Sequence, residues 1–225
     1  MRAAVPSAPQ ILKPHEPVAE RVLLPGDPGR ALRLAQQLID GPRMLNHHRG
    51  LWGYSGPGPD GAPLTIQSTG LGGPSAAAVV AELIALGARR LVRVGTAAGL
   101  GATPLGTLVV AEAALAADGA SRALGAGDRV AADPDITAAL VGGTARRGLL
   151  ACADIHDPVR AAAWVAAGAV AFDLATAAVL AAARRDGAAA GAIVAVTRDG
   201  GGRLGDDELA AREAELGALA AAALG

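Results

Sequence analysis

The sequence predicts an α/β fold formed by a single domain, and two observations lead to this prediction. Short apolar runs of strand length alternate along the chain with longer segments of helical periodicity. Such alternation is typical of a β-sheet with helices packed on its faces. At 225 residues the chain is also within the range of single α/β domains. We therefore treat residues 1–225 as one domain and expect residues 1–20 to form an extended N-terminal segment.

Each expected element has its own signal. The strands are predicted by apolar runs at residues 22–24, 64–68, 91–94, 108–111, 168–172 and 192–196. The helices are predicted by periodic patterns at residues 30–39, 74–86, 174–185 and 206–224. Pro74 begins the second helix after two glycines and Gly87 ends it, as helix termini prefer. The segment GPGPDGAP, residues 56–63, predicts a turn between two strands.

Composition and charge limit the possible classes of protein. Hydrophobic residues make up 52% of the chain and aromatic residues only 2%, so Ala, Val and Leu must form most of the core. The formal net charge is −1 and no Lys-rich or Arg-rich run occurs, which argues against nucleic acid and membrane surfaces as partners. The single cysteine, Cys152, excludes an intrachain disulfide, and its alanine neighbours indicate a buried side chain. With no signal peptide evident either, we expect a cytoplasmic protein.

Three glycine-rich turns follow expected strands and suggest an anion-binding site. They lie in VLLPGDPGR (22–30), STGLGGPSAA (68–77) and VRVGTAAGL (92–100), and match neither a P-loop nor the dinucleotide-binding fingerprint. Ligands of open α/β sheets bind at the carboxyl ends of strands, where glycine lets backbone N–H groups approach an anion. Arg30, Arg93 and Arg49 lie in or near apolar-to-glycine segments, and guanidinium groups match phosphate oxygens well. A single arginine is more often a solvated surface residue, but Arg93 lies inside an apolar run, where an unpaired charge is costly.

Several of these stretches together resemble the nucleoside phosphorylase family of the hexameric purine and uridine phosphorylase type. They are LLPGDPGRA, HRGLWGYSG, the segment from IQSTGLGG to GTAAGL, and DGASRALG, in the family's order from about residue 20 to residue 125. The resemblance implies a central mixed, partly barrel-like β-sheet flanked by helices. It also implies a homodimer or homohexamer.

The resemblance implies a phosphate site and a catalytic pair. The phosphate ligands would be Gly26, Arg30, Arg93 and Thr96, with Arg49 donated across the dimer interface. A complete arginine set favours phosphorolysis over the hydrolysis catalysed by the related methylthioadenosine nucleosidases, which do not need it. Asp199 at the end of a late strand would be the general acid for the departing base, paired with Arg212 thirteen positions later. Arg198 is an alternative partner for Asp199, and an isolated Asp before three glycines is also typical of a plain turn.

The ribose and base sites depart from the family pattern. The residues implied there are His15, Thr69, His156, Asp173 and Leu174. The family's acidic-Met-Glu motif is represented by FDLATAA, in which Ala175 stands where a Glu would hold the ribose hydroxyls. His156 stands where Phe would stack on the base, and His15 is equally compatible with a simple exposed side chain.

The resulting prediction is phosphorolysis of the N-glycosidic bond of a nucleoside, preferably a purine nucleoside, to free base and pentose 1-phosphate. Nucleoside and phosphate are the expected partners. Inorganic phosphate is a co-substrate, and we expect no cofactor and no metal, because Gly50 stands where some relatives place a metal-binding Glu. The alternatives are a weakened or inactive homologue that binds a phosphate-bearing ligand and, third, a uridine phosphorylase. Uridine phosphorylases contact uracil with a Gln and an Arg; this chain has Arg160 at that place but no accompanying Gln.

Overall fold

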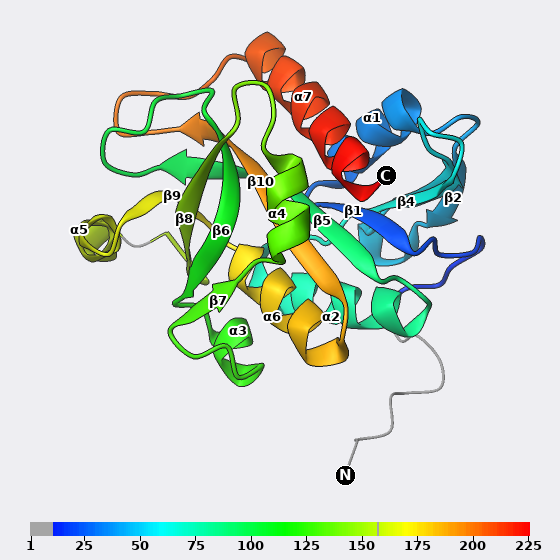
Figure 1. Ribbon diagram of the computed structural model, residues 1–225, viewed down its shortest axis with the longest axis horizontal. Coiled ribbons are helices and arrows are strands. Elements are labelled where there is room, and N and C mark those ends of the chain that lie inside the picture. Colours follow the sequence, from blue (N-terminus) through cyan, green and yellow to red (C-terminus); the bar gives the residue numbers. More distant parts are fainter. Residues whose placement is uncertain (1–10, 157) are drawn as a thin grey trace.

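A mixed β-sheet forms the centre of the computed structural model, which describes residues 11–156 and 158–225 (Figure 1). Its strands are β1 (Arg21–Pro25), β2 (Arg43–Asn46), β3 (Gly53–Pro57), β4 (Pro63–Gln67), β5 (Arg90–Gly99), β6 (Leu108–Ala116), β7 (Arg129–Ala131), β8 (Arg146–Cys152), β9 (Ala169–Asp173) and β10 (Ala189–Arg198). The helices are α1 (Pro28–Leu38), α2 (Gly72–Ala85), α3 (Gly119–Ala123), α4 (Pro134–Leu140), α5 (Pro158–Ala166), α6 (Thr176–Asp186) and α7 (Asp206–Leu224). A short 3-10 helix, His48–Gly50, lies between β2 and β3.

Half of the sheet closes into a barrel. β5 pairs with β10 and with β9, while β6 and β8 complete the ring between them. β1, β4, β3 and β2 extend from the other edge of β5 as an open sheet. Because β1, β4 and β10 are all parallel to their neighbours around β5, their carboxyl ends meet at one edge. The mixed, partly barrel-like α/β fold implied by the resemblance is confirmed.

Helices cover the sheet from two sides. On one side α7 contacts both α1 and α4, and on the other side α2 packs against α6 (Figure 1). In α6, every side chain from Thr176 to Ala183 is buried, as expected for a core made largely of small residues. α7 and α1 approach so closely at Gly217 that a Cβ there would overlap the Leu34 side chain. The packing of both helical layers thus depends on small residues.

All six expected strands and all four expected helices are present, and the 56–63 turn joins β3 to β4. The sequence patterns missed β2, β7, β8, α3, α4 and α5. β8 begins with two exposed arginines, Arg146 and Arg147, so only its second half has the apolar pattern that predicts a strand. α4 has only 7 residues and forms because Asp133 caps it and Pro134 begins it. Residues 11–20 contain no helix or strand, while residues 1–10 of the expected N-terminal segment lie outside the described residues.

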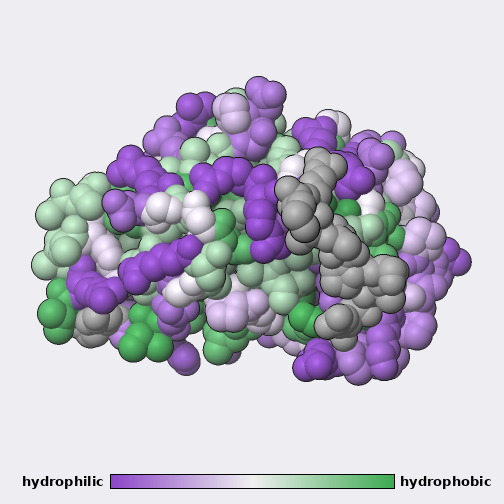
Figure 2. Space-filling model, turned by 90° about the horizontal axis from the view of Figure 1, so that it is seen from below, coloured by the Kyte–Doolittle hydropathy of each residue, from purple (hydrophilic) through white to green (hydrophobic). Residues whose placement is uncertain are grey.

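The surface mixes residue types. In Figure 2, hydrophilic residues run across the visible face, and the hydrophobic ones form small separate patches. Among the described residues, no helix has the length and apolar character needed to cross a membrane.

Candidate functional site

A cavity of about 480 Å³ opens at the edge where the carboxyl ends of the strands meet. Gly26 follows β1, Gly70 follows β4, Thr96 belongs to β5, Asp173 ends β9 and Thr197 lies near the end of β10, and all five line the cavity. The three glycine-rich turns of the sequence therefore surround one space. The volume is in the range of about 300 to 1,000 Å³ that is usual for small-molecule sites.

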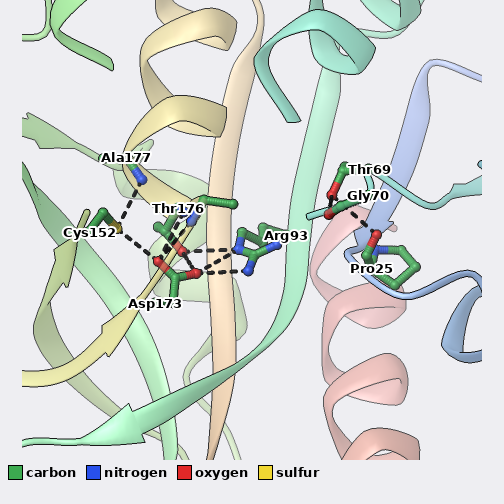
Figure 3. Close-up of polar contacts among 9 residues, drawn as sticks. Pro25, Thr69, Gly70, Arg93, Cys152, Asp173, Thr176 and Ala177 are labelled. Atoms are coloured by element: carbon green, nitrogen blue, oxygen red, sulfur yellow. Dashed lines mark hydrogen bonds and ion pairs between the residues drawn. The ribbon is translucent and has the colours of Figure 1, made fainter. Parts of the chain in front are cut away.

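The two turns after β1 and β4 are tied to each other. The backbone N–H of Thr69 donates to the carbonyl of Pro25 at 2.8 Å, and the Thr69 hydroxyl lies 3.4 Å from the same oxygen (Figure 3). Gly70 and Gly72 have φ angles of 74° and 82°, which L side chains rarely adopt. Thr69 itself is fully buried and does not line the cavity, so its hydroxyl fixes the turn.

Arg93 extends from β5 into the cavity and is 6% exposed. Its Nε and Nη2 donate to Asp173 Oδ2 at 2.9 and 2.8 Å, and Nε also lies 3.2 Å from Thr176 Oγ1 (Figure 3). Nη1 is buried and has no hydrogen-bond partner among the described residues. It lies 3.9 Å from the position of a Cβ on Gly26. An unsatisfied guanidinium N–H beside a glycine turn is a donor available to an anionic ligand.

Asp173 is buried next to Arg93, and both of its carboxylate oxygens accept hydrogen bonds. Its second oxygen, Oδ1, accepts from the backbone N–H groups of Ala175 and Thr176 and from the Cys152 thiol (Figure 3). Burial by itself raises the pKa of the carboxyl, but attraction to Arg93 and the hydrogen bonds outweigh it and lower the pKa below its ordinary value. Burial, reinforced by this carboxylate, raises the pKa of the Cys152 thiol well above its ordinary value. Asp173 therefore holds Arg93 and the start of α6.

Arg30 approaches the cavity from the first turn of α1. Asp27 caps this helix by accepting a hydrogen bond from the backbone N–H of Arg30 at 2.7 Å. Arg30 lines the cavity, and its guanidinium donates from Nε to Glu213 Oε1 of α7 at 2.7 Å. Glu213 has no distinguishing signal in the sequence, because a Glu in a charged helix is usually solvated.

Of two further candidates for the ribose and the base, Leu174 lines the cavity and His156 does not. Leu174 and Ala175 follow β9, and Ala175 is 2% exposed. His156 is exposed and meets the edge of the Phe172 ring at a centroid distance of 5.8 Å. Phe172 lines the cavity and stacks on Trp164. An aromatic group thus lies beside the apolar part of the cavity, where a flat ligand ring would find contact area.

The proposed acid and its partner are not in contact. Asp199 Oδ1 accepts from the backbone N–H groups of Gly201 and Gly202 at 2.8 and 2.9 Å, whereas Arg212 pairs with Glu215 at 2.6 Å. Neither Asp199 nor Arg212 lines the cavity, although Arg198 does.

His15 and Arg49 do not line the cavity of their own chain. The His15 and His47 rings stack with centroids 5.5 Å apart, and Arg49 is exposed. Arg49 has a φ of 59°, the one positive value among the described non-glycine residues. A left-handed conformation costs free energy for a residue with a side chain and often marks a functional position.

The geometry defines an α/β protein whose cavity presents guanidinium groups, glycine turns and the first turns of α1 and α2 to an anionic ligand. Comparison with known proteins agrees with this description. The chain belongs to the phosphorylase superfamily, whose family model matches residues 20–224.

Named relatives match a shorter part. A uridine phosphorylase of Treponema pallidum is 41% identical over 106 residues, which are 47% of this chain and 40% of the relative. A purine nucleoside phosphorylase of the DeoD type from an Exiguobacterium species is 44% identical over 84 residues, which are 37% of this chain and 35% of the relative. The matched stretch thus spans less than half of each relative.

Proposed function

We propose that this protein catalyses the phosphorolysis of a nucleoside, with a preference for purine nucleosides. The observation that carries the proposal is the unpartnered Nη1 of Arg93, buried beside the Gly26 turn in the same cavity as Arg30. Two guanidinium groups and a glycine turn suit a doubly charged phosphate. Thr96, half-buried in the same lining, adds a hydroxyl donor.

The chemistry follows from this placement of charge. A phosphate oxygen forms a bond to the anomeric carbon while the bond from that carbon to the base nitrogen breaks. Arg30 and Arg93 orient the phosphate, and the sugar passes through an oxocarbenium-like transition state. The base leaves with the bonding electron pair and takes up a proton, for which we propose Asp199 as the donor. For this step Asp199 must release the amides of Gly201 and Gly202, and Arg212 must turn from Glu215 toward it.

Two observations keep a second candidate open. Ala175 provides no side-chain acceptor for ribose hydroxyls, and the Asp173 carboxylate is already occupied by Arg93 and the start of α6. A weakened homologue that binds a phosphate-bearing ligand would need only the anion side of the cavity. Uridine phosphorolysis is the third candidate, since uridine phosphorylases are among the relatives.

The test is release of free base from a panel of purine and pyrimidine nucleosides, measured by chromatography with and without inorganic phosphate. We expect phosphate-dependent release, fastest with purine nucleosides. No release from any nucleoside would refute the enzyme proposal, and equal release without phosphate would indicate hydrolysis. A large gain in activity in Ala175→Glu would support the weakened homologue.

A matched pair of variants tests the anion side. Arg30→Gln removes a guanidinium from the cavity, and we expect kcat/KM for phosphate to fall about 100-fold, as when one preorganised donor is lost. Arg33→Gln, one turn further along α1 and outside the cavity lining, should leave it within about twofold. Equal effects of the two substitutions would contradict the assignment of Arg30.

We also propose a homodimer or homohexamer in which Arg49 reaches the phosphate of a neighbouring subunit. Its exposure, its left-handed backbone and its absence from the cavity lining of its own chain support this role. Sedimentation analysis gives the oligomeric state. Mixing Arg49→Gln with Arg93→Gln subunits should restore part of the activity only if Arg49 acts across the interface.

A further inference from the structure

Glu213 is a buried carboxylate that joins α7 to two arginines of α1. It is 3% exposed, and each of its oxygens has a different partner. Oε1 accepts from Arg30 Nε at 2.7 Å, while Oε2 accepts from Arg33 Nε at 3.1 Å and from Arg33 Nη2 at 2.5 Å. Arg33 is largely solvated, with a side chain 54% exposed, whereas the Arg30 side chain is 9% exposed. The buried half of this cluster is therefore the contact with Arg30.

The contact uses only one edge of the Arg30 guanidinium. Nε is bonded to Glu213, and neither Nη has a hydrogen bond to another described residue. Because the side chain lines the cavity, the Nη groups are the part that a ligand would meet. Arg93 is held in the same way, since Asp173 bonds its Nε and Nη2 and leaves Nη1 unpartnered. Each of the two guanidinium groups, of Arg30 and of Arg93, is thus held by a buried carboxylate from another element.

The packing of α7 on α1 makes this contact possible. Gly217 lies four residues after Glu213 and on the same buried face of α7. A Cβ at Gly217 would overlap Leu34, so the absence of a side chain lets the two helices approach. At this separation the short Glu213 side chain reaches the first turn of α1, where little water competes for Arg30.

We propose that Glu213 is a positioning residue, which holds Arg30 through Nε so that its Nη groups face the phosphate. The proposal rests on the phosphate site of the proposed function. An arginine side chain has many rotamers, so an acceptor that fixes Nε reduces the entropy lost when the anion binds. The negative charge of Glu213 works in the opposite direction, because it attracts the same guanidinium that must attract phosphate. The effect of the length of the Glu213 side chain and the effect of its charge can therefore be separated by mutation.

Two conservative variants separate them. Glu213→Gln keeps the length of the side chain and an oxygen acceptor for Arg30 Nε but removes the charge. Glu213→Asp keeps the charge but shortens the side chain by one methylene, so the carboxylate no longer reaches Arg30 in its present rotamer. The readouts are the dissociation constant for inorganic phosphate, from calorimetric titration of the full-length protein, and the KM for phosphate against that for nucleoside.

We expect Glu213→Asp to bind phosphate about tenfold more weakly and Glu213→Gln to bind it at least as tightly as the unmodified protein. The KM for nucleoside should change little in either variant. Unchanged phosphate binding in Glu213→Asp would overturn the proposal. An equal loss in Glu213→Gln would also overturn it, because a side chain that keeps the length and the acceptor oxygen would then fail to hold Arg30.

Controls distinguish this role from a purely structural one and from failure of the proposed function. A structural role predicts lower melting temperatures in both variants with an unchanged phosphate dissociation constant, which also overturns the proposal. Arg33→Gln removes the solvated partner of the same carboxylate and should leave phosphate binding within about twofold. If the unmodified protein does not bind phosphate, the proposed function itself fails. If it binds phosphate and Glu213→Asp binds equally well, only the role of Glu213 fails.

Discussion

Asp173→Asn is the substitution for which the structure gives the most definite expectation. The change keeps the shape of the side chain and removes the charge that faces Arg93. Asp173 Oδ2 accepts from Arg93 Nε, Arg93 Nη2 and Thr176 Oγ1, and Oδ1 accepts from the Cys152 thiol and the backbone N–H groups of Ala175 and Thr176. An asparagine has one oxygen and one NH2 group. In either orientation its NH2 group therefore faces donors.

The magnitude follows from the burial of both partners. The side chains of Arg93 and Asp173 are 7% and 1% exposed, so removing the negative charge leaves an uncompensated buried guanidinium. Breaking a buried pair in this way costs about 3 to 5 kcal/mol, a large part of the roughly 5 to 15 kcal/mol by which a domain is usually stable. Arg93 would also lose the contact that orients it, so phosphate binding should weaken as well.

The assay is urea unfolding at pH 7, with the free energy of unfolding extrapolated to water. Asp186→Asn, at the end of α6, is the control, because it removes the partner of the half-exposed Arg185 and should cost about 0 to 1 kcal/mol. A loss below about 1 kcal/mol for Asp173→Asn would refute the reasoning, because the buried pair would then behave like a surface pair.

The same carboxyl should make stability depend on pH in acid. Its pKa in the folded state is lowered from the ordinary value of 3.8 by Arg93 and the hydrogen bonds, despite burial. As the pH falls through the ordinary value, the unfolded chain takes up a proton that the folded protein does not, so the free energy of unfolding decreases. The stabilisation by Asp173 is thus complete above the ordinary pKa of the carboxyl and is lost as the pH falls to its lower pKa in the folded protein. Urea unfolding at several acid pH values should show a smaller slope for Asp173→Asn than for the unmodified protein, and equal slopes would contradict this.

Two further predictions concern packing and reactivity. Gly217→Ala should lower the free energy of unfolding by about 1 to 2 kcal/mol, because overlap with Leu34 outweighs the roughly 1 kcal/mol by which alanine stabilises a helix relative to glycine. Urea unfolding measures this change. A gain in stability would contradict the prediction and show that α7 can move away from α1. The Cys152 thiol should react with a thiol reagent such as 5,5′-dithiobis(2-nitrobenzoic acid) only as the protein unfolds, because it is buried and its pKa is raised; fast labelling of the folded protein would contradict this.

The sequence by itself determined most of the longer elements and the edge of the sheet at which the cavity opens. Hydrophobic periodicity is a local property, so it identified six strands and four helices, and the glycine turns with Arg93 marked the edge at which the cavity opens. Short elements such as α4 were missed, because too few residues carry a period. β8 was missed because its first residues are exposed arginines.

Only the tertiary structure decided which charges meet. Arg30 and Glu213 are 183 residues apart, and Arg93 and Asp173 are 80 apart, so no local pattern relates them. The family resemblance implied that Asp199 pairs with Arg212, yet in the structure Asp199 caps its own turn and Arg212 pairs with Glu215. The physical reason is that a buried ion pair depends on the separation and orientation of two packed elements. These are set by close approaches such as that at Gly217, which a one-dimensional sequence does not contain.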